Sequence, residues 1–325
     1  MIASVMASAP SSNIRKMNLA KDLDRVADLI ELCFPIDRDP DGQSYVQEMR
    51  KAAREMRLLG WLNSLAEFGN QKPAGFVWEE AGEIVGNLSL IPFQEGGRRI
   101  HLIANVAVHP DRRCNGIARS LTVHTLSNLR RLGEPHTWLQ VREDNAVATN
   151  LYRSVGFQDE VVRTTWRIRP LELTPLKLAG DQMIKVSQCQ KHNWTQHQKW
   201  LASAYPVRIR WNLPVDFKRF EPGALQWLVN FLDGIRLRQW GVACNGDCAG
   251  VITWQKSTTF ADHLWLAFDE AQEAACLPVV VTAALKRLPG RHPLSVDYPQ
   301  GRSEPLFKAL GFQQFRTLIW MKCRL

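Results

Sequence analysis

The stretch of sequence that decides the fold reads VAVHPDRRCNGIARS and runs from Val106 to Ser120. Apolar residues alternate from Ile100 onward with a period of two, which is typical of a strand, and the pattern stops at Pro110. A helix is expected to begin after Gly116. The sequence therefore predicts a strand, a tight turn and a helix in immediate succession.

A turn of this kind suits an anionic ligand. Its successive backbone N–H groups lie at the positive end of the helix dipole and form a cradle suited to a pyrophosphate. Gly116 would let the backbone approach such a ligand closely. Positive charge is added by Arg112, Arg113 and Arg119.

Strand and helix signals alternate on both sides of this stretch. Helices are expected at 20–34, 43–65, 117–132 and 146–155, and strands at 75–78, 84–90, 100–108, 137–141 and 157–168. The alternation predicts an α/β (α+β) fold in which helices flank a mixed central β-sheet.

The second half of the chain repeats the first weakly. LYRSVGF at 151–157 matches LFKALGF at 306–312, and a short predicted strand precedes each. Asn245-Gly246 marks a hairpin turn in the second half. We therefore predict two copies of one fold in tandem, with a first domain at 1–172, a linker at 173–182 and a second domain at 183–325.

Composition narrows the class of protein. The 325 residues carry 41 Lys+Arg against 32 Asp+Glu, a net charge of +9, and 45% are hydrophobic, which excludes a disordered chain. The longest apolar run is too short to span a membrane, so no membrane partner is expected. Seven scattered cysteines favour reduced thiols and a cytoplasmic location. Residues 1–12 are expected to form a frayed terminus rather than a signal peptide.

Two ordered motifs carry a family resemblance. The pattern Val108-His109-Pro110-x-x-Arg113-x-x-Gly116-Ile117-Ala118 resembles motif A of the GNAT superfamily of N-acetyltransferases. Farther on, Asn145-x-x-Ala148-x-x-Leu151-Tyr152-x-x-x-Gly156-Phe157 resembles motif B of the same family. The resemblance is strong over about 75–165 and weaker over about 235–325, and it implies the acyl-CoA N-acyltransferase fold.

The resemblance implies that acetyl-CoA is the co-substrate and that a primary amine attacks its thioester directly. It implies cofactor contacts by Val106, Ala107 and Val108 along the pantetheine arm, in the manner of an added strand. The pyrophosphate would be wrapped by Arg113, Cys114, Asn115, Gly116, Ile117, Ala118 and Arg119. Asn145 would face the pantetheine or a catalytic water, and Tyr152 would lie near the sulfur and protonate the leaving thiolate.

The base that takes the proton of the amine stays open. Many relatives place a glutamate on the strand before Val108, and this strand carries none. Glu80, Glu83, Glu143 or a water on Asn105 are the alternatives. A backbone donor near 106–108 would stabilise the oxyanion.

The second copy lacks this chemistry. Its motif A position reads EAQEAACLP at 270–278, without a glycine turn or an arginine, and Glu270 and Glu273 would repel a pyrophosphate. Phe307 replaces the tyrosine. We expect this copy to complete the acceptor pocket or to stabilise the first domain.

Other features are expected to be structural. No metal site is predicted, because Cys244 and Cys248 flank a turn, and His192 and His197 are expected at the surface. Eight of the twelve tryptophans follow residue 190 and are expected to fill the core of the second copy.

Alternatives remain open for function. The acceptor is either a small-molecule amine or a peptide amine, and the mycothiol-synthase group is also a tandem of this fold, although no residue assigns this chain to it. A non-catalytic acyl-CoA-binding or sensor module is the second class. Nucleic-acid binding is disfavoured, since no recognition motif accompanies the charge. A homodimer is also left open.

Overall fold

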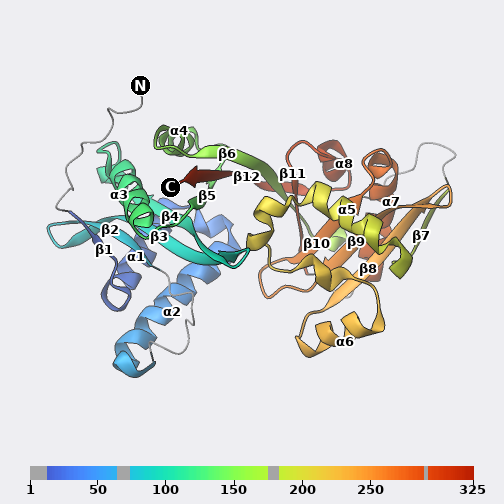
Figure 1. The fold of residues 1–325 in the computed structure, drawn as a ribbon, viewed down its shortest axis with the longest axis horizontal. Coiled ribbons are helices and arrows are strands. Elements are labelled where there is room, and N and C mark those ends of the chain that lie inside the picture. Colours follow the sequence, from blue (N-terminus) through green and yellow to red (C-terminus); the bar gives the residue numbers. More distant parts are fainter. Residues whose placement is uncertain (1–12, 64–73, 175–182, 289–291) are drawn as a thin grey trace. The chain divides into compact units, whose positions relative to one another are not determined.

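The computed structural model describes residues 13–63, 74–174, 183–288 and 292–325. The expected frayed terminus at 1–12 and residues 175–182 of the expected linker lie outside the described residues. Packing divides the chain into two compact units (Figure 1). Unit 1 comprises Met1–Glu160 with Ile319–Leu325, and unit 2 comprises Val161–Leu318. The domain boundaries expected from the sequence stay a proposal.

Unit 1 is a mixed sheet with helices on both faces. Its elements are β1 (Ile14–Lys16), α1 (Leu19–Cys33), α2 (Pro40–Asn63), β2 (Ala74–Glu80), β3 (Glu83–Glu95), β4 (Arg98–Val108), α3 (Ile117–Arg131), β5 (His136–Arg142), α4 (Ala146–Ser154) and the end of β12 (Gln313–Arg324). The strand order is β1-β2-β3-β4-β5-β12. Neighbours from β1 to β4 are antiparallel, and β4 and β5 are parallel.

Neighbouring residues of β2 show how the two faces are covered. Val77 packs into a core with α1 and α2, whereas the ring of Phe76 contacts His124 of α3. On the α3 side, a β-carbon added to Gly86 would lie only 2.8 Å from Ile117. The glycine therefore lets the first turn of α3 lie directly on β3.

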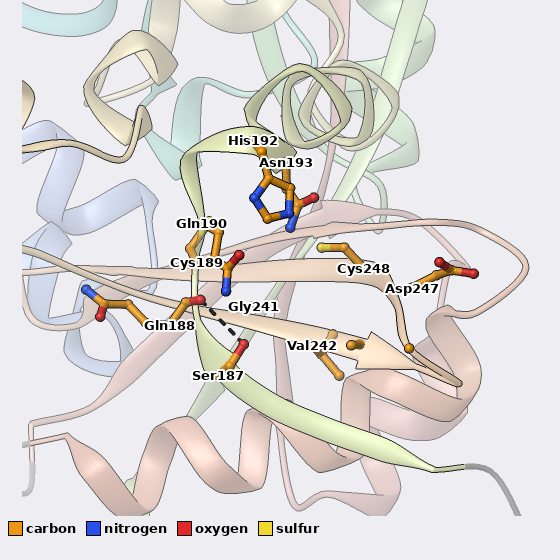
Figure 2. Close-up of a pocket in the computed structure, with 12 residues that line it drawn as sticks. Ser187, Gln188, Cys189, Gln190, His192, Asn193, Gly241, Val242, Asp247 and Cys248 are labelled. Carbon is orange, nitrogen blue, oxygen red and sulfur yellow. Dashed lines mark hydrogen bonds between the residues drawn. The ribbon is translucent and has the colours of Figure 1, made fainter.

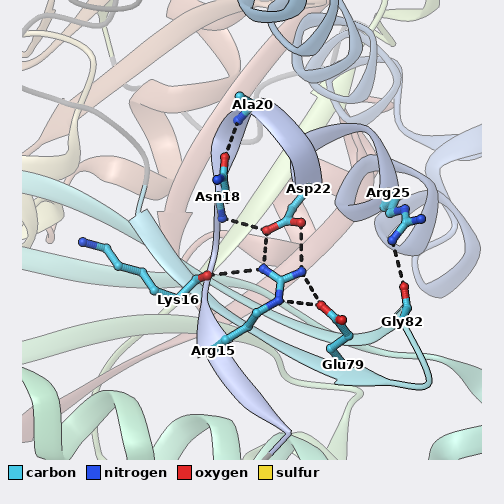
Figure 3. A network of polar contacts seen from close by, with 8 residues as sticks. All are labelled: Arg15, Lys16, Asn18, Ala20, Asp22, Arg25, Glu79 and Gly82. Atoms are coloured by element: carbon cyan, nitrogen blue, oxygen red, sulfur yellow. Dashed lines mark hydrogen bonds and ion pairs between the residues drawn. The ribbon is translucent and has the colours of Figure 1, made fainter.

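A polar network fixes the start of the sheet (Figure 3). Arg15 of β1 donates to both carboxylate oxygens of Asp22 on α1, at 2.6 and 3.0 Å, and to Glu79 of β2 at 2.5 Å. Asp22 is only 3% exposed and also accepts the backbone N–H of Asn18. One guanidinium thus joins two strands and a helix of unit 1.

Unit 2 has the same order of strands. Its elements are β6 (Gln158–Ile168, from Val161 on), β7 (Ile184–Gln188), α5 (Trp194–Ala204), α6 (Ala224–Leu232), β8 (Leu237–Cys244), β9 (Asp247–Gln255), β10 (Asp262–Phe268), α7 (Glu273–Arg287), β11 (Leu294–Pro299), α8 (Glu304–Ala309) and the start of β12. The order β7-β8-β9-β10-β11-β6 has four antiparallel steps and one parallel step, between β10 and β11. The predicted tandem of mixed sheets is confirmed.

The sixth strand of each unit comes from an unexpected part of the chain. In unit 1 the strand beside β5 is β12, the last strand of the sequence. Its Trp320 packs against Trp138 of β5, and Leu325 donates to the carbonyl of Pro135 at 3.2 Å. The strand that directly follows α4 joins unit 2 instead. No described helix is long and apolar enough to cross a bilayer.

Candidate functional site

The strands β4 and β5 separate where the sequence motif begins. Their parallel register covers only His101 to Ile103 of β4, opposite Thr137 to Leu139 of β5. Beyond Ile103 the described register gives β4 no partner on this side, up to its end at Val108. An open strand edge offers N–H and C=O groups to an extended ligand. The predicted contact residues Val106, Ala107 and Val108 lie in this open segment.

A β-bulge lies in the same segment of β4. The register with β3 shifts between Asn87 and Ser89, and Asn105 adopts a left-handed backbone with φ +51°. The buried amide of Asn87 donates to the carbonyl of Asn105 at 2.8 Å, while its own Oδ1 has no hydrogen-bond partner. Asn87 of β3 therefore stabilises the bulge through its amide nitrogen, while its amide oxygen accepts no hydrogen bond.

Helix α2 also reaches the bulge. The side-chain amide of Asn105 donates to the hydroxyl of Tyr45 at 2.7 Å. Desolvation raises the pKa of Tyr45, although the hydrogen bond from Asn105 opposes the shift. The phenol is thus protonated at neutral pH, and its own proton stays available to a further acceptor. Sequence analysis singled out Asn105 but missed Tyr45, because helical periodicity does not say which strand residue a helix will meet.

The predicted anion cradle has the backbone that such a role requires. A short 3-10 helix, η2 (Pro110–Arg112), leads to Cys114 with φ +63° and Gly116 with φ +74°, and the segment from Pro110 to Gly116 is exposed. Gly116 caps α3 without a side chain. The first N–H groups of α3 are therefore free of helical partners and open to a ligand. A β-carbon at Gly116 would meet no protein atom within 4 Å, so the space above it is clear.

A hydrogen-bond relay joins the two sequence motifs. Arg119, in the first turn of α3, donates to the hydroxyl of Ser154 at 2.7 Å, and Ser154 donates to the carbonyl of Leu151 at 2.6 Å. Both acceptors belong to α4. One guanidinium nitrogen of Arg119 thus links α4 to the start of α3.

Tyr152 lies on α4, as predicted, and Asn145 lies directly before this helix, but their surroundings differ. Asn145 is the exposed N-cap, and its Oδ1 accepts the N–H of Ala148 at 3.1 Å. Tyr152 is 8% exposed with its ring against Phe157, and burial raises its pKa. The capping role of Asn145 was not expected. A catalytic part for either residue stays a prediction.

The alternatives for the base are placed differently by the structure. The carboxylate of Glu80 is 3.1 Å from Arg112 and accepts from the indole of Trp78 at 2.9 Å. Glu83 is exposed at the hairpin turn between β2 and β3. Asn105 is the alternative that lies on the open segment of β4.

Unit 2 shares the short parallel pairing, which covers only Asp262 and His263 of β10 opposite β11, but it differs in the bulge and in the start of the following helix. The register of β9 and β10 runs without a shift, and Gly250 of β9 is covered by the ring of Phe268. The N-terminal turn of α7 contains Glu273, which is 3% exposed. Its carboxylate is 2.6 Å from Arg302 and accepts from Ser303 at 2.5 Å. An internal carboxylate thus lies at the helix end that would have to bind a pyrophosphate.

A cavity of about 260 Å³ lies elsewhere in unit 2, between the end of β7 and the β8–β9 hairpin (Figure 2). It is bordered by Cys189, His192, Asn193, Asp247 and Cys248. Burial raises the pKa of the Cys189 thiol to about 11. The residues predicted to bind the cofactor do not line this cavity.

The predicted surface position of His197 is wrong. Its side chain is 1% exposed on the inner face of α5, next to Trp194, and neither ring nitrogen has a hydrogen-bond partner. His192 is exposed as expected. The five-residue spacing alone could not show which of the two faces the core.

Comparison with known proteins shows that the motif region is similar to members of one family. The model of the acetyltransferase (GNAT) family matches residues 23–157. The ribosomal protein bS18 alanine N-acetyltransferase of Escherichia coli (strain K12) is 39% identical over 62 residues, 19% of this chain and 42% of that protein. A mycothiol acetyltransferase of Saccharomonospora viridis is 32% identical over 112 residues, 33% of this chain and 35% of that protein. The matches thus span less than half of these relatives.

Solved structures support the fold across both units. A tandem GNAT protein from the clavulanic acid biosynthesis pathway aligns with a TM-score of 0.50 and 15% identity, covering 96% of this chain and 98% of that one. A GCN5-related N-acetyltransferase from Sphaerobacter thermophilus aligns with a TM-score of 0.56 and 13% identity, covering 97% of both chains. At these identities the likeness concerns the fold alone.

Proposed function

We propose that this chain, whose residues 23–157 match the model of the acetyltransferase (GNAT) family, is a member of that family. It would transfer an acetyl group from acetyl-CoA to a primary amine, and it would do so in unit 1. The observation that carries the proposal is the open segment of β4. It follows the short pairing of His101–Ile103, contains the bulge at Asn105 and runs into the exposed loop that ends at Gly116.

The described residues fit an acyl-CoA. The open edge of β4 would hold the pantetheine arm through backbone groups of Val106 and Val108. The N–H groups around Gly116 would bind the pyrophosphate, since a helix N-terminus with a left-handed glycine before it is an anion site. When bound, the thioester supplies an activated acetyl carbonyl.

The chain's own groups would then serve the transfer. A backbone N–H near the bulge would stabilise the oxyanion that forms as the amine attacks. Tyr152 would donate a hydrogen bond or proton to the departing sulfur, which its protonated state allows. We assign the removal of the amine proton to a water held by Asn105 and Tyr45, because these two polar side chains meet at the bulge.

The names of the relatives suggest two classes of acceptor. One relative is named a ribosomal protein bS18 alanine N-acetyltransferase and the other a mycothiol acetyltransferase. Either acceptor class is compatible with an amine that approaches Tyr45 and Asn105. Unit 2, whose helix end carries the internal carboxylate of Glu273, would serve as support and bind no cofactor. The cytoplasmic location predicted from the cysteines stays a proposal.

The test is acetyl transfer by the intact chain to three amine classes: a polyamine, an amino sugar and a peptide with a free α-amino group. Mass spectrometry would follow the acetylated product. We expect product from at least one class and none from the Gly116→Glu variant. Gly133→Glu is the matched control, because Gly133 has the same φ of +74° and the same open space at the other end of α3.

One observation favours a second function. The described part of β4 carries no carboxylate, and Tyr152 is buried. A non-catalytic acyl-CoA-binding module would bind acetyl-CoA through the same loop and yield no acetylated amine. Stoichiometric binding with no product from any acceptor class would therefore select this second function over transfer.

A further inference from the structure

Helix α6 of unit 2 has its polar and apolar sides reversed. Its single buried residue is Asn230, which donates to the carbonyl of Arg219 at 2.9 Å and accepts from Gln226 at 3.0 Å. A surface helix of a globular protein ordinarily turns its apolar stripe inward. Here the polar side chains are the ones that attach the helix to the protein.

The apolar side chains of α6 point to solvent instead. Large ones are exposed by between 45% and 77%, namely Leu225, Trp227, Leu228, Phe231 and Leu232. Trp227 and Phe231 stack at 5.6 Å with an interplanar angle of 14°, which makes a flat aromatic surface. The described hydrophobic core of unit 2 includes none of these residues. Figure 1 shows α6, in gold, apart from the strands of its unit.

From this reversal we infer that the exposed face of α6, defined by these five side chains, is a docking surface for a second copy of this chain. The face presents roughly 600 Å² of apolar surface, the upper end of what the largest patch of a monomer shows. Two such faces packed together would bury at most about 1,200 Å², a ceiling that lies above the ~1,000 Å² that a specific interface needs.

Charge supports a second copy over a lipid surface. From Ala224 to Leu232 the helix contains no charged residue, so two identical faces meet without repulsion. Interfacial membrane helices carry lysine and arginine on their polar side, and the inward side of α6 carries Gln226 and Asn230. A two-fold interface also needs one self-complementary patch, which a short uncharged helix with a central tryptophan provides.

The experiment is sedimentation velocity on the intact chain from 1 to 100 µM, with two variants of the face, Trp227→Glu and Leu225→Glu. Leu132→Glu is the control, since Leu132 is 65% exposed at the end of α3 in unit 1. We expect a dimer for the parent chain and the control, and at least a tenfold weaker dimer for both face variants. An unchanged circular dichroism spectrum and a cooperative thermal transition would show that the variants remain folded, whereas the midpoint itself should fall as the dimer is lost.

Three results would overturn the inference. The first is a parent chain that stays monomeric at 100 µM, and the second is a dimer that survives both face variants. The third is a monomer that binds vesicles of phosphatidylcholine and phosphatidylserine and loses that binding in Trp227→Glu, which would assign the face to a lipid surface.

Discussion

The side-chain amide of Asn105 donates a hydrogen bond of 2.7 Å to the hydroxyl of Tyr45, and this contact ties helix α2 to the bulge of β4. The two residues are far apart in sequence, yet they meet where β4 loses its partner β5. The bulge turns Asn105 into a left-handed backbone conformation with φ +51°. The contact therefore brings two polar groups to the segment where we place the reacting thioester.

Removing the Tyr45 hydroxyl should weaken catalysis and leave cofactor binding intact. For Tyr45→Phe we expect kcat/KM for the amine to fall about fivefold, the effect of one lost hydrogen bond of ~1 kcal/mol. The Kd for acetyl-CoA should stay within twofold. Steady-state kinetics with a calorimetric Kd would measure both. Unchanged kcat/KM would remove Tyr45 from the acceptor side of the site.

Tyr152→Phe should lower kcat by about 100-fold if Tyr152 protonates the leaving thiolate. Because burial raises the pKa of Tyr152 above 10.0, the phenol stays protonated through neutral and mildly alkaline pH. Ionisation of Tyr152 should therefore cause no fall in the kcat of the parent enzyme between pH 7 and 9. The pH profiles of the parent and of Tyr152→Phe should have the same shape over this range. A kcat within threefold of the parent would assign Tyr152 to packing against Phe157 alone.

The network around Arg15 should stabilise unit 1. Arg15→Ala leaves the buried carboxylate of Asp22 without its partner, so we expect a loss of about 2–3 kcal/mol in the free energy of unfolding. Urea titration would measure it. Glu55→Gln, which breaks the exposed pair with Lys51, is the control and should cost under ~0.5 kcal/mol. Equal effects of the two changes would contradict the argument.

The same network predicts a dependence on acid. Desolvation of Asp22 raises its pKa, but the hydrogen bonds from Arg15 and the Asn18 N–H outweigh it, and the net shift is downward from 3.8. A lowered carboxyl pKa stabilises the fold above the unfolded value and ceases to do so as the pH falls below it. The difference between the parent chain and Arg15→Ala should therefore shrink below pH 4.

His197 should make the free energy of unfolding depend on pH between pH 4 and 6.5, above the range in which Asp22 acts. Burial lowers its pKa from 6.5 to about 4. Between pH 4 and 6.5, His197 is therefore protonated in the unfolded chain and neutral in the folded chain. The free energy of unfolding is therefore not reduced by His197 above pH 6.5, and it declines by about 3 kcal/mol as the pH falls to 4. In His197→Leu this part of the decline should vanish, whereas His192→Gln, an exposed control, should keep it. Parallel urea midpoints in parent and His197→Leu would refute the assignment.

Local signals made the centre of unit 1 predictable. The alternation that ends at Pro110, the glycine before α3 and the glycine after α4 set β4, α3 and α4 close to their observed bounds. The Asn245-Gly246 turn likewise connects β8 and β9 as expected. Each of these features depends on residues near one another in sequence.

Features that depend on distant partners could not be predicted. Nothing in residues 313–324 shows that the last strand will lie beside β5, because strand pairing is chosen by the whole sheet. The bulge at Asn105 required an asparagine in a left-handed conformation, which a period of two does not reveal. Trp227 was expected in the core, but the reversed helix α6 leaves it 66% exposed.

The central claim is that one acyl-CoA binds to unit 1 at the loop before α3. Calorimetric titration of the intact chain with acetyl-CoA tests it most directly, with Gly116→Glu and Gly133→Glu in parallel. The account predicts one site per chain, no measurable binding in Gly116→Glu and parent affinity in Gly133→Glu. Parent affinity in Gly116→Glu, or a stoichiometry of two, would contradict it.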